Sequence, residues 1–153
     1  MVHIEQYLEN LKSQLFQPNN WQQIVMTRRW AESIPEEAGV YVMKENDKIV
    51  YVGETGNLQG RMYDLLDSRH HTVRRTIGEK LFSNEEGFTK ATTRKKFPEH
   101  IEELVNNHIC TNLYLAYLEV QLGRKELEEF IESDIEVETR LNKRGKRKKK
   151  KRK

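Results

Sequence analysis

The 153-residue chain has a single cysteine, Cys110, so it cannot form a disulfide within itself. This low cysteine content is compatible with a reducing compartment. The chain also lacks any apolar run near the roughly 20 residues that a membrane-spanning helix needs, so we expect no membrane association. With 36% hydrophobic and 33% charged residues, the composition is compatible with a soluble globular protein.

Several common motifs are missing as well. The chain contains no CxxC pair, no P-loop and no GxGxxG, so it offers no support for a zinc finger or a nucleotide cofactor. The N-terminal segment MVHIEQYLENLKSQL has neither a basic start nor an apolar core, which predicts no secretory signal. We therefore expect a cytoplasmic protein, nucleoid-associated if the source is prokaryotic and nuclear if it is eukaryotic.

The net charge of +3 hides an uneven distribution of charge. Residues 143–153, KRGKRKKKKRK, contain ten Lys or Arg and no acid, which leaves 17 basic against 24 acidic residues in positions 1–142, a net charge of −7. Such a block of like charges repels itself and is expected to be disordered. It is either a plain solvated terminus, an electrostatic arm for nucleic acid or, in a eukaryote, a nuclear address.

Hydrophobic periodicity predicts a chain of helices interrupted by three short strands. The predicted helices cover residues 3–15, 58–66, 73–81, 98–105 and 124–138, with a further helix as one interpretation of 21–31. The predicted strands cover residues 39–43, 48–52 and 112–120. Asn57 and Thr72 precede two of the helices and are plausible N-caps.

The first two strands form a hairpin around the polar turn Glu45-Asn46-Asp47. Adding the later strand gives a small, mostly antiparallel, three-stranded sheet, which the helices must cover. The later strand, NLYLAYLEV, is apolar on both alternations and should be covered on both faces. The sequence therefore predicts an α+β, or mixed α/β, domain.

Two Gly/Tyr pairs stand out on the hairpin, Gly39-Val40-Tyr41 and Tyr51-Val52-Gly53. Because the two strands must pair, the two tyrosine hydroxyls can lie near one another on the sheet. A glycine at a strand end lets another backbone or a ligand approach closely.

These residues resemble the signature of the GIY-YIG nuclease superfamily. The matching elements are GVY (39–41), YVG (51–53), NL (57–58) and Arg61, with both isoleucines of the signature replaced by valine. The resemblance covers residues 39–142. It implies a nuclease domain over about 36–142, preceded by a helical extension (1–35) and followed by the basic tail (143–153).

The superfamily also carries a Glu on a later helix and an Asn beyond it, for which Glu128 and Asn142 are the candidates here. Glu126, Glu129 and Glu132 compete with Glu128. At about 100° per residue, Glu128 lies roughly 85° from the centre of the apolar stripe, so it borders the buried face, while Glu129 points away. Arg61 occupies a similar border position on its own helix.

The resemblance implies metal-dependent endonucleolytic cleavage of DNA. Tyr41 would be the general base and Tyr51 would position the water or the phosphate, while Arg61 would stabilise phosphate charge. Glu128 would hold one Mg²⁺ (or Mn²⁺), a hard cation that prefers oxygen ligands. Since a free tyrosine has a pKa of about 10, the base role requires nearby positive charge.

Nucleic-acid contacts are expected from the segment RHHTVRR and from the C-terminal region. The candidates are Arg69, His70, His71, Arg74, Arg75, Asn142, Lys146 and Arg147. Whether His70 or His71 takes part in catalysis stays open, as does a homodimeric state. The alternative function, from a different class, is a non-catalytic nucleic-acid-binding domain that keeps the same fold.

Overall fold

The computed structural model describes residues 2–136, 140 and 141. Its helical elements are α1 (Val2–Leu15), the 3-10 turn η1 (Pro18–Asn20), α2 (Arg28–Glu32), α3 (Leu58–Asp64), α4 (Thr72–Phe82), α5 (Glu99–Asn112) and α6 (Arg124–Glu132). Its strands are β1 (Gln22–Gln23), β2 (Gly39–Glu45), β3 (Lys48–Thr55) and β4 (Leu113–Glu119). The strands form one sheet in the order β1-β4-β2-β3, in which every neighbouring pair is antiparallel. The predicted mixed α/β class is confirmed.

The sheet has four strands, not the three that the sequence predicts. The additional strand, β1, lies inside the segment 21–31 that could be read as a helix, and α2 occupies only the end of that segment. Two glutamines show no apolar alternation, so nothing local indicates a strand. Pairing with β4, where Gln22 lies opposite Leu115, decides the conformation instead.

The β2–β3 hairpin turns at Asn46 and Asp47, which have φ angles of 53° and 67°. Positive φ at both central residues is the geometry of a type I′ turn, whose twist matches that of the flanking strands. Asn and Asp tolerate this left-handed region better than other non-glycine residues. The turn brings Tyr41 and Tyr51 onto adjacent strands, as the sequence predicts.

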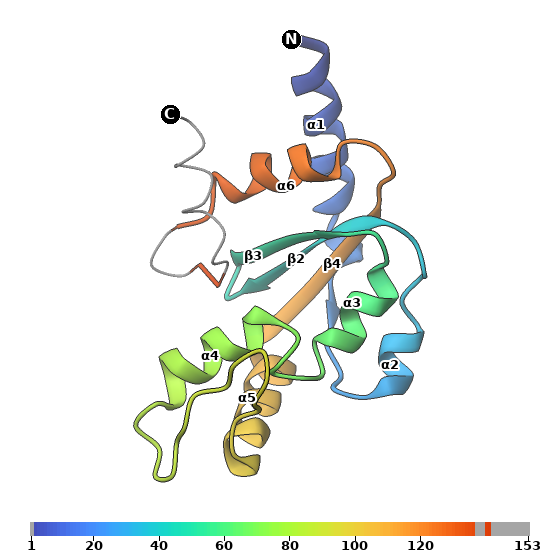
Figure 1. Cartoon of the computed structure of the whole chain (residues 1–153). Helices are drawn as coiled ribbons and strands as arrows, with labels where there is room; N and C mark the ends of the chain where they lie inside the picture. Colours follow the sequence, from blue (N-terminus) through green and yellow to red (C-terminus); the bar gives the residue numbers. More distant parts are fainter. Residues whose placement is uncertain (1, 137–139, 142–153) are drawn as a thin grey trace.

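Helices cover both faces of the sheet, and each face has its own apolar cluster (Figure 1). α1 and α6 pack on one face, which we call the α6 face, while α3, α4 and α5 lie on the other, the α4 face. Within β4, Leu115 joins the cluster of the α4 face and Ala116 that of the α6 face, which confirms that this strand is covered on both sides.

Residues before position 36 contribute to this architecture. Leu8 and Leu15 of α1 are buried in the α6-face cluster, and β1 belongs to the sheet. The division of the chain at residues 35 and 142 stays a prediction. Among the helices that the structure describes, none is long and apolar enough to cross a membrane.

Candidate active site

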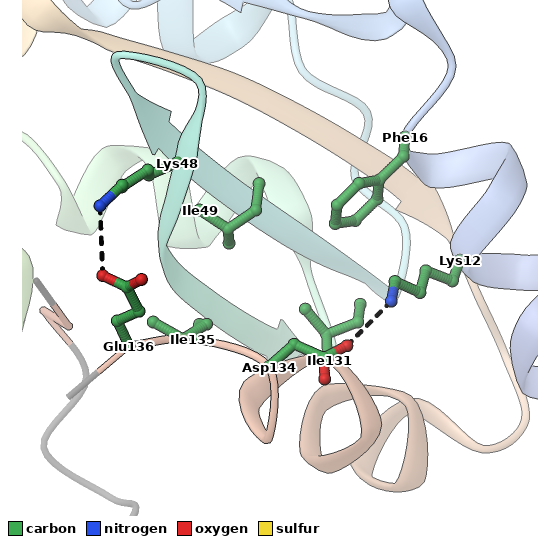
Figure 2. Close-up of a pocket in the computed structure, with 8 residues that line it drawn as sticks. All are labelled: Lys12, Phe16, Lys48, Ile49, Ile131, Asp134, Ile135 and Glu136. Atoms are coloured by element: carbon green, nitrogen blue, oxygen red, sulfur yellow. Dashed lines mark hydrogen bonds and ion pairs between the residues drawn. The ribbon is translucent and has the colours of Figure 1, made fainter.

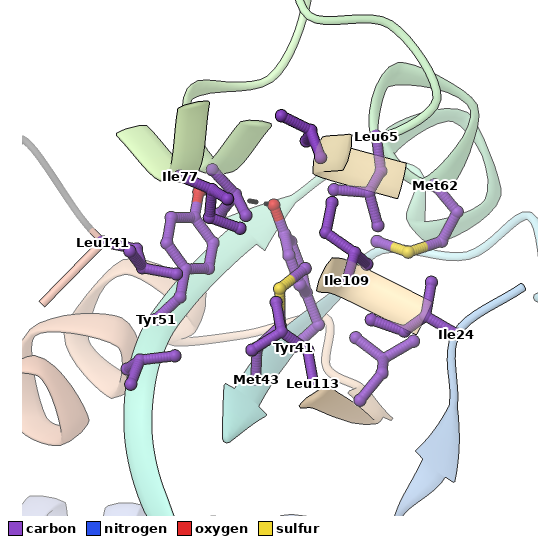
Figure 3. Packing of buried hydrophobic residues seen from close by; sticks show 14 of the residues in the cluster. Ile24, Tyr41, Met43, Tyr51, Met62, Leu65, Ile77, Ile109, Leu113 and Leu141 are labelled. Carbon is purple, nitrogen blue, oxygen red and sulfur yellow. Dashed lines mark hydrogen bonds between the residues drawn. The ribbon is translucent and has the colours of Figure 1, made fainter. Parts of the chain in front are cut away.

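Tyr41 and Tyr51 lie side by side on the α4 face, near the middle of the hairpin (Figure 3). Tyr41 is opposite Gly53 and Tyr51 is opposite Met43, so the two tyrosines are diagonal neighbours across the strand pair. Their ring centroids are 5.7 Å apart and their hydroxyl oxygens 3.5 Å apart. This separation is longer than a normal O–H···O hydrogen bond, so the direct contact between the hydroxyls is weak.

Gly53 allows this arrangement because the ring of Tyr41 lies across its backbone. A Cβ atom at Gly53 would come within 2.7 Å of Cζ of Tyr41 and 2.8 Å of its hydroxyl oxygen. Real Cβ atoms essentially never show such contacts, so any larger residue would push the Tyr41 ring out of position. The glycine of YVG therefore has a packing role at the tyrosine pair, where an aromatic side chain approaches it instead of the backbone or ligand that the sequence suggests.

His71 is the third member of this cluster. It is the N-cap of α4, and its Nδ1 accepts a hydrogen bond of 3.2 Å from the backbone N–H of Val73. Its Nε2 lies 2.9 Å from the hydroxyl oxygen of Tyr41. Since a backbone N–H can only donate, Nδ1 carries no proton, and a neutral ring must carry its proton on Nε2. The His71 N–H therefore donates to the oxygen of Tyr41.

The cap at His71 corrects the prediction that Thr72 caps this helix, because Thr72 is instead the first helical residue. An imidazole nitrogen can replace the side-chain oxygen of a usual cap, a possibility that the N-cap preferences of the residues do not suggest. The predicted cap at Asn57 is confirmed, since its side chain accepts from the N–H of Gly60 at 3.0 Å.

Arg61 projects from α3 toward the tyrosines and retains access to solvent, with 26% of its side chain exposed. Its guanidinium donates to Oδ2 of Asp64 and to the backbone oxygen of His70, both at 3.0 Å. Burial lowers the pKa of Arg61, but the nearby Tyr41 and Tyr51 raise it by more than burial lowers it. The net shift of the pKa is therefore upward. The side chain is thus a permanent positive charge beside the tyrosine pair.

Burial controls the protonation of the two enclosed groups. It raises the pKa of Tyr41 well above its usual value, and Tyr51 adds to this shift, while the charge of Arg61 opposes it. Burial also lowers the pKa of His71 well below its usual value, assisted by the charges of Arg61, Arg75 and Arg74. In this structure, Tyr41 is therefore a neutral phenol and His71 a neutral imidazole at physiological pH. The positive charge that a tyrosine base requires is present in Arg61, but it does not outweigh desolvation.

Glu128 lies on α6, whose apolar residues Leu127 and Ile131 pack on the face of the sheet opposite the tyrosines. The segment from α6 onward runs antiparallel along β3, with Arg124 paired to Glu54 and Glu136 paired to Lys48. Glu128 therefore lies level with the middle of β3, the edge strand that carries Tyr51.

The structure buries Glu128, in agreement with its expected border position, but it buries Glu132 to the same extent. Glu132 is one turn further along α6, so burial alone does not separate the two. Burial therefore narrows the candidates from four acids to these two, because Glu126 is exposed and Glu129 only half-buried.

A divalent cation would have few carboxylate ligands at this site. Among residues 2–136, 140 and 141, no group of three or more His, Cys, Asp or Glu side chains is placed to hold a metal ion. One carboxylate, such as that of Glu128 on α6, fits Mg²⁺, which is commonly held by one or two carboxylates together with water and substrate phosphate. The donor set does not fit a dedicated site made only of protein ligands.

The segment RHHTVRR is mostly engaged with its own loop. Arg69 forms a two-bond contact with Asp67, and Arg75 donates to the backbone oxygens of Ser68 and Arg69. The side chain of His70 is 53% exposed and is the most open part of the segment. Contacts of Arg69, His70 and Arg75 with nucleic acid stay predictions.

Arg74 is buried in a structural network, which corrects the prediction that it contacts phosphate. Only 1% of its side chain is exposed. Its guanidinium pairs with Glu102 and donates to Ser68 at 2.9 Å and to Asn106 at 2.6 Å, which joins α4 to α5. A buried guanidinium that is satisfied in this way cannot reach a nucleic-acid backbone. No local pattern in the sequence indicates this network, because Glu102 and Asn106 lie 28 and 32 residues from Arg74.

The remaining candidates, Asn142, Lys146 and Arg147, lie outside the described residues, as does the basic tail. Leu141, just before them, is buried beside Tyr51, and its backbone N–H donates to the oxygen of Val50 at 2.7 Å (Figure 3). The described chain therefore ends at the edge of the strand that carries Tyr51.

A pocket of about 200 Å³ lies away from the tyrosine cluster, between α1, β3 and the end of α6 (Figure 2). Its charged groups are paired, Lys12 with Asp134 at 3.0 Å and Lys48 with Glu136 at 3.2 Å. Because these lysines are already neutralised, the pocket is a poor anion site and does not compete with the tyrosine cluster as the candidate active site.

Comparison with known proteins identifies the family of the chain. A family model described as the GIY-YIG catalytic domain matches residues 22–153. The chain is similar to UvrABC system protein C of Fusobacterium nucleatum subsp. nucleatum, with 44% identity over 39 residues, which is 26% of this chain and 7% of that protein. The chain therefore matches only a small part of this much longer relative. No solved structure matches the chain.

Proposed function

Because the chain belongs to the GIY-YIG catalytic-domain family, we propose that it is a metal-dependent endonuclease that hydrolyses phosphodiester bonds in DNA. The observation that carries this proposal is the cluster of Tyr41, Tyr51, His71 and Arg61 on one face of the sheet. Structural packing alone needs neither a neutral imidazole directed at a buried phenol nor a permanent cation beside it. The similarity to one segment of UvrABC system protein C supports the same conclusion.

In the proposed mechanism, Tyr41 is the general base. Its deprotonated oxygen would accept the hydrogen bond from Nε2 of His71, 2.9 Å away, and the electrostatic attraction of Arg61. Both interactions favour the phenolate, which must be stabilised against a large desolvation cost. His71 does not take the proton from Tyr41, since its Nε2 already carries one and its Nδ1 is used by Val73.

Arg61 and Tyr51 would act on the phosphate. The guanidinium of Arg61 is partly exposed and presents donors in a fixed fork, which suits the non-bridging oxygens of a phosphodiester. The hydroxyl of Tyr51 lies 3.5 Å from that of Tyr41, so it can orient the attacking water or a phosphate oxygen at the same point. Asp64 and the backbone of His70 hold the guanidinium in place.

Glu128, on α6, would be the protein ligand of Mg²⁺ or Mn²⁺. A bound divalent cation supplies Lewis-acid stabilisation of charge on the phosphate and leaving oxygen. With waters and the substrate phosphate as further ligands, a single carboxylate suffices to hold it.

A non-catalytic nucleic-acid-binding domain is the second candidate. The observation that favours it is the complete burial of Tyr41 and His71, because a scissile phosphate cannot touch enclosed oxygens unless the site opens. The nuclease proposal therefore requires an opening on the side of Arg61, the exposed member of the cluster, when substrate binds. A substantial minority of complexes show loop or domain rearrangements of this kind on binding.

One experiment separates the two candidates. The purified protein is incubated with plasmid, branched DNA and RNA, with Mg²⁺, with Mn²⁺ and with a chelator. The nuclease predicts cleavage that depends on the metal and disappears in Tyr41→Phe, which removes one oxygen and little volume. Cleavage that persists in Tyr41→Phe would indicate a contaminating nuclease. Binding without cleavage, in every metal condition, would support the second candidate.

A further inference from the structure

A compact basic turn projects from the loop between α4 and α5. Residues 92–96 are all exposed, and Arg94, Lys95 and Lys96 are consecutive. The backbone closes the turn twice, from the N–H of Thr92 to the oxygen of Lys95 at 2.8 Å and in the reverse direction at 3.4 Å. The hydroxyl of Thr92 also accepts from the N–H of Arg94 at 3.1 Å. The three cations are therefore presented on a defined turn.

Two buried residues anchor this turn on either side. Ala91 and Phe97 are both buried in the apolar cluster that contains the tyrosine pair. The ring of Phe97 covers Gly78 of α4 so closely that a Cβ atom there would meet it at 2.2 Å. Phe97 also packs against Phe88, with the rings tilted and their centroids 5.7 Å apart. The turn is thus fixed to α4 at its base.

The same anchor connects the turn to the candidate active site. The N–H of Phe97 donates to Oε2 of Glu102 at 2.9 Å, and the other oxygen of this carboxylate pairs with Arg74. Arg74 lies on α4 only three residues after His71, which contacts Tyr41. Gly78, under Phe97, is seven residues from His71, which corresponds to about 10 Å along the helix. The turn therefore lies on the α4 face, at a short and fixed distance from the tyrosine cluster.

The charge of the turn stands out against the rest of the domain. Residues 1–142 carry a net charge of −7, which repels a polyanion at long range. In the part of the chain that the structure describes, Arg94, Lys95 and Lys96 form no ion pair. Glu85 and Glu86 belong to the same loop but precede Ala91, at the opposite end from the turn. Three unpaired cations on a fixed turn are suited to phosphate oxygens.

We propose that the Thr92–Lys96 turn is a second phosphate-binding site, which holds the backbone of the nucleic acid a few nucleotides from the bond that is cleaved. This inference rests on the proposed nuclease function. The offset of at least about 10 Å along α4 corresponds to about three nucleotide steps on one strand, at 3.4 Å per phosphate. The contact is to phosphate, so it positions the substrate on the α4 face without reading its sequence.

The test measures DNA binding by fluorescence anisotropy across a salt series, with the full-length protein and a labelled duplex in the absence of divalent metal. The slope of log affinity against log salt is negative. The variant Arg94→Gln/Lys95→Gln/Lys96→Gln should make it less steep by about 2 to 3, at about 0.9 for each lost phosphate contact. The variant Arg94→Lys should leave the slope unchanged. The matched control, Lys12→Gln/Lys48→Gln/Lys125→Gln, removes three cations from the α6 side and should change the slope by less than about 1.

Cleavage distinguishes failure of this inference from failure of the proposed function. At saturating DNA, the cleavage rate of the variant with all three cations of the turn replaced should be within about twofold of wild type, because none of the reacting groups is changed. Its KM should rise. If the wild-type protein cleaves DNA but the triple variant has an unchanged salt slope, the second phosphate-binding site alone is overturned. If the wild-type protein neither binds nor cleaves nucleic acid, both the nuclease function and the second site are overturned.

Discussion

The imidazole of His71 donates a hydrogen bond from its Nε2–H to the hydroxyl oxygen of Tyr41, 2.9 Å away, in a region closed to solvent. The two residues are 30 positions apart and lie on different elements. Their contact depends on the N-cap of α4, because the hydrogen bond from Val73 to Nδ1 selects the tautomer that can donate to Tyr41. A local feature of a helix terminus thus determines the hydrogen bonding of the proposed base.

Tyr41→Phe should abolish most activity while leaving the fold nearly intact, since it removes one oxygen and little volume. We expect at least about a 100-fold loss in cleavage, and a smaller loss for Tyr51→Phe. Because burial holds the pKa of Tyr41 above its usual value of about 10, the active phenolate is scarce near neutrality. Wild-type cleavage should therefore rise with pH, by up to about tenfold per unit, between pH 7 and 9. Equal and small losses in both variants would point to another base.

His71→Asn separates the capping role of this residue from its contact with Tyr41. Asparagine is among the best N-cap residues, so α4 should remain capped, but its shorter side chain cannot reach the hydroxyl of Tyr41. Cleavage should fall by about 100-fold, the scale for one lost charge-stabilising donor, and the pH profile should move upward. His71→Ala is the matched variant that loses both roles. If His71→Asn cleaves like wild type, the donor role is refuted.

The buried imidazole also predicts acid sensitivity of the fold. The pKa of His71 is lower in the folded state than the usual value of about 6.5, so the unfolded chain binds the proton more tightly. The stability it contributes is fully present above about pH 6.5 and is lost as the pH falls toward the folded pKa, by up to about 1.4 kcal/mol per unit. Thermal unfolding at pH 5 and pH 8 should show this loss in wild type and a smaller one in His71→Asn. An equal acid loss in both proteins would assign the effect to other groups.

Arg61→Ala and Glu128→Gln should each reduce cleavage by at least about 100-fold. Arg61 is partly exposed, so its loss should leave a normal melting transition. Glu128 is buried, and glutamine is therefore the safer replacement because it keeps the volume. Glu129→Gln, which faces away from the apolar stripe, is the control for a change of charge on α6. Normal cleavage by Glu128→Gln, with loss in Glu132→Gln, would transfer the ligand role by one helical turn.

Removal of residues 143–153 should weaken DNA binding strongly at low salt. We expect about four to six contacts between the tail and phosphate. These contacts would add roughly 4 to 5 to the steepness of the negative slope of log affinity against log salt. Cleavage at saturating DNA should change little, because none of the proposed catalytic residues lies in the tail. Anisotropy across a salt series on the full-length and truncated proteins measures both slopes. If truncation leaves the slope unchanged, the tail is a bystander or an address signal.

The sequence alone determined the hairpin, its tyrosine pair and the family. Short apolar runs on either side of a polar Asn-Asp turn are local patterns, and they place Tyr41 and Tyr51 on adjacent strands whatever packs around them. The cap at Asn57 also follows from short-range geometry, since it depends on residues within one helical turn, and the same geometry places Glu128 at the border of the apolar stripe of its helix.

Only the tertiary structure decided which neighbours those residues have. β1 is a strand because β4 pairs with it, His71 meets Tyr41 because α4 packs over the hairpin, and Arg74 is structural because α5 supplies Glu102. The protonation of the site was also beyond the sequence. A pKa depends on burial as much as on charge, and the desolvation that keeps Tyr41 neutral arises only when residues far apart in the chain close around it.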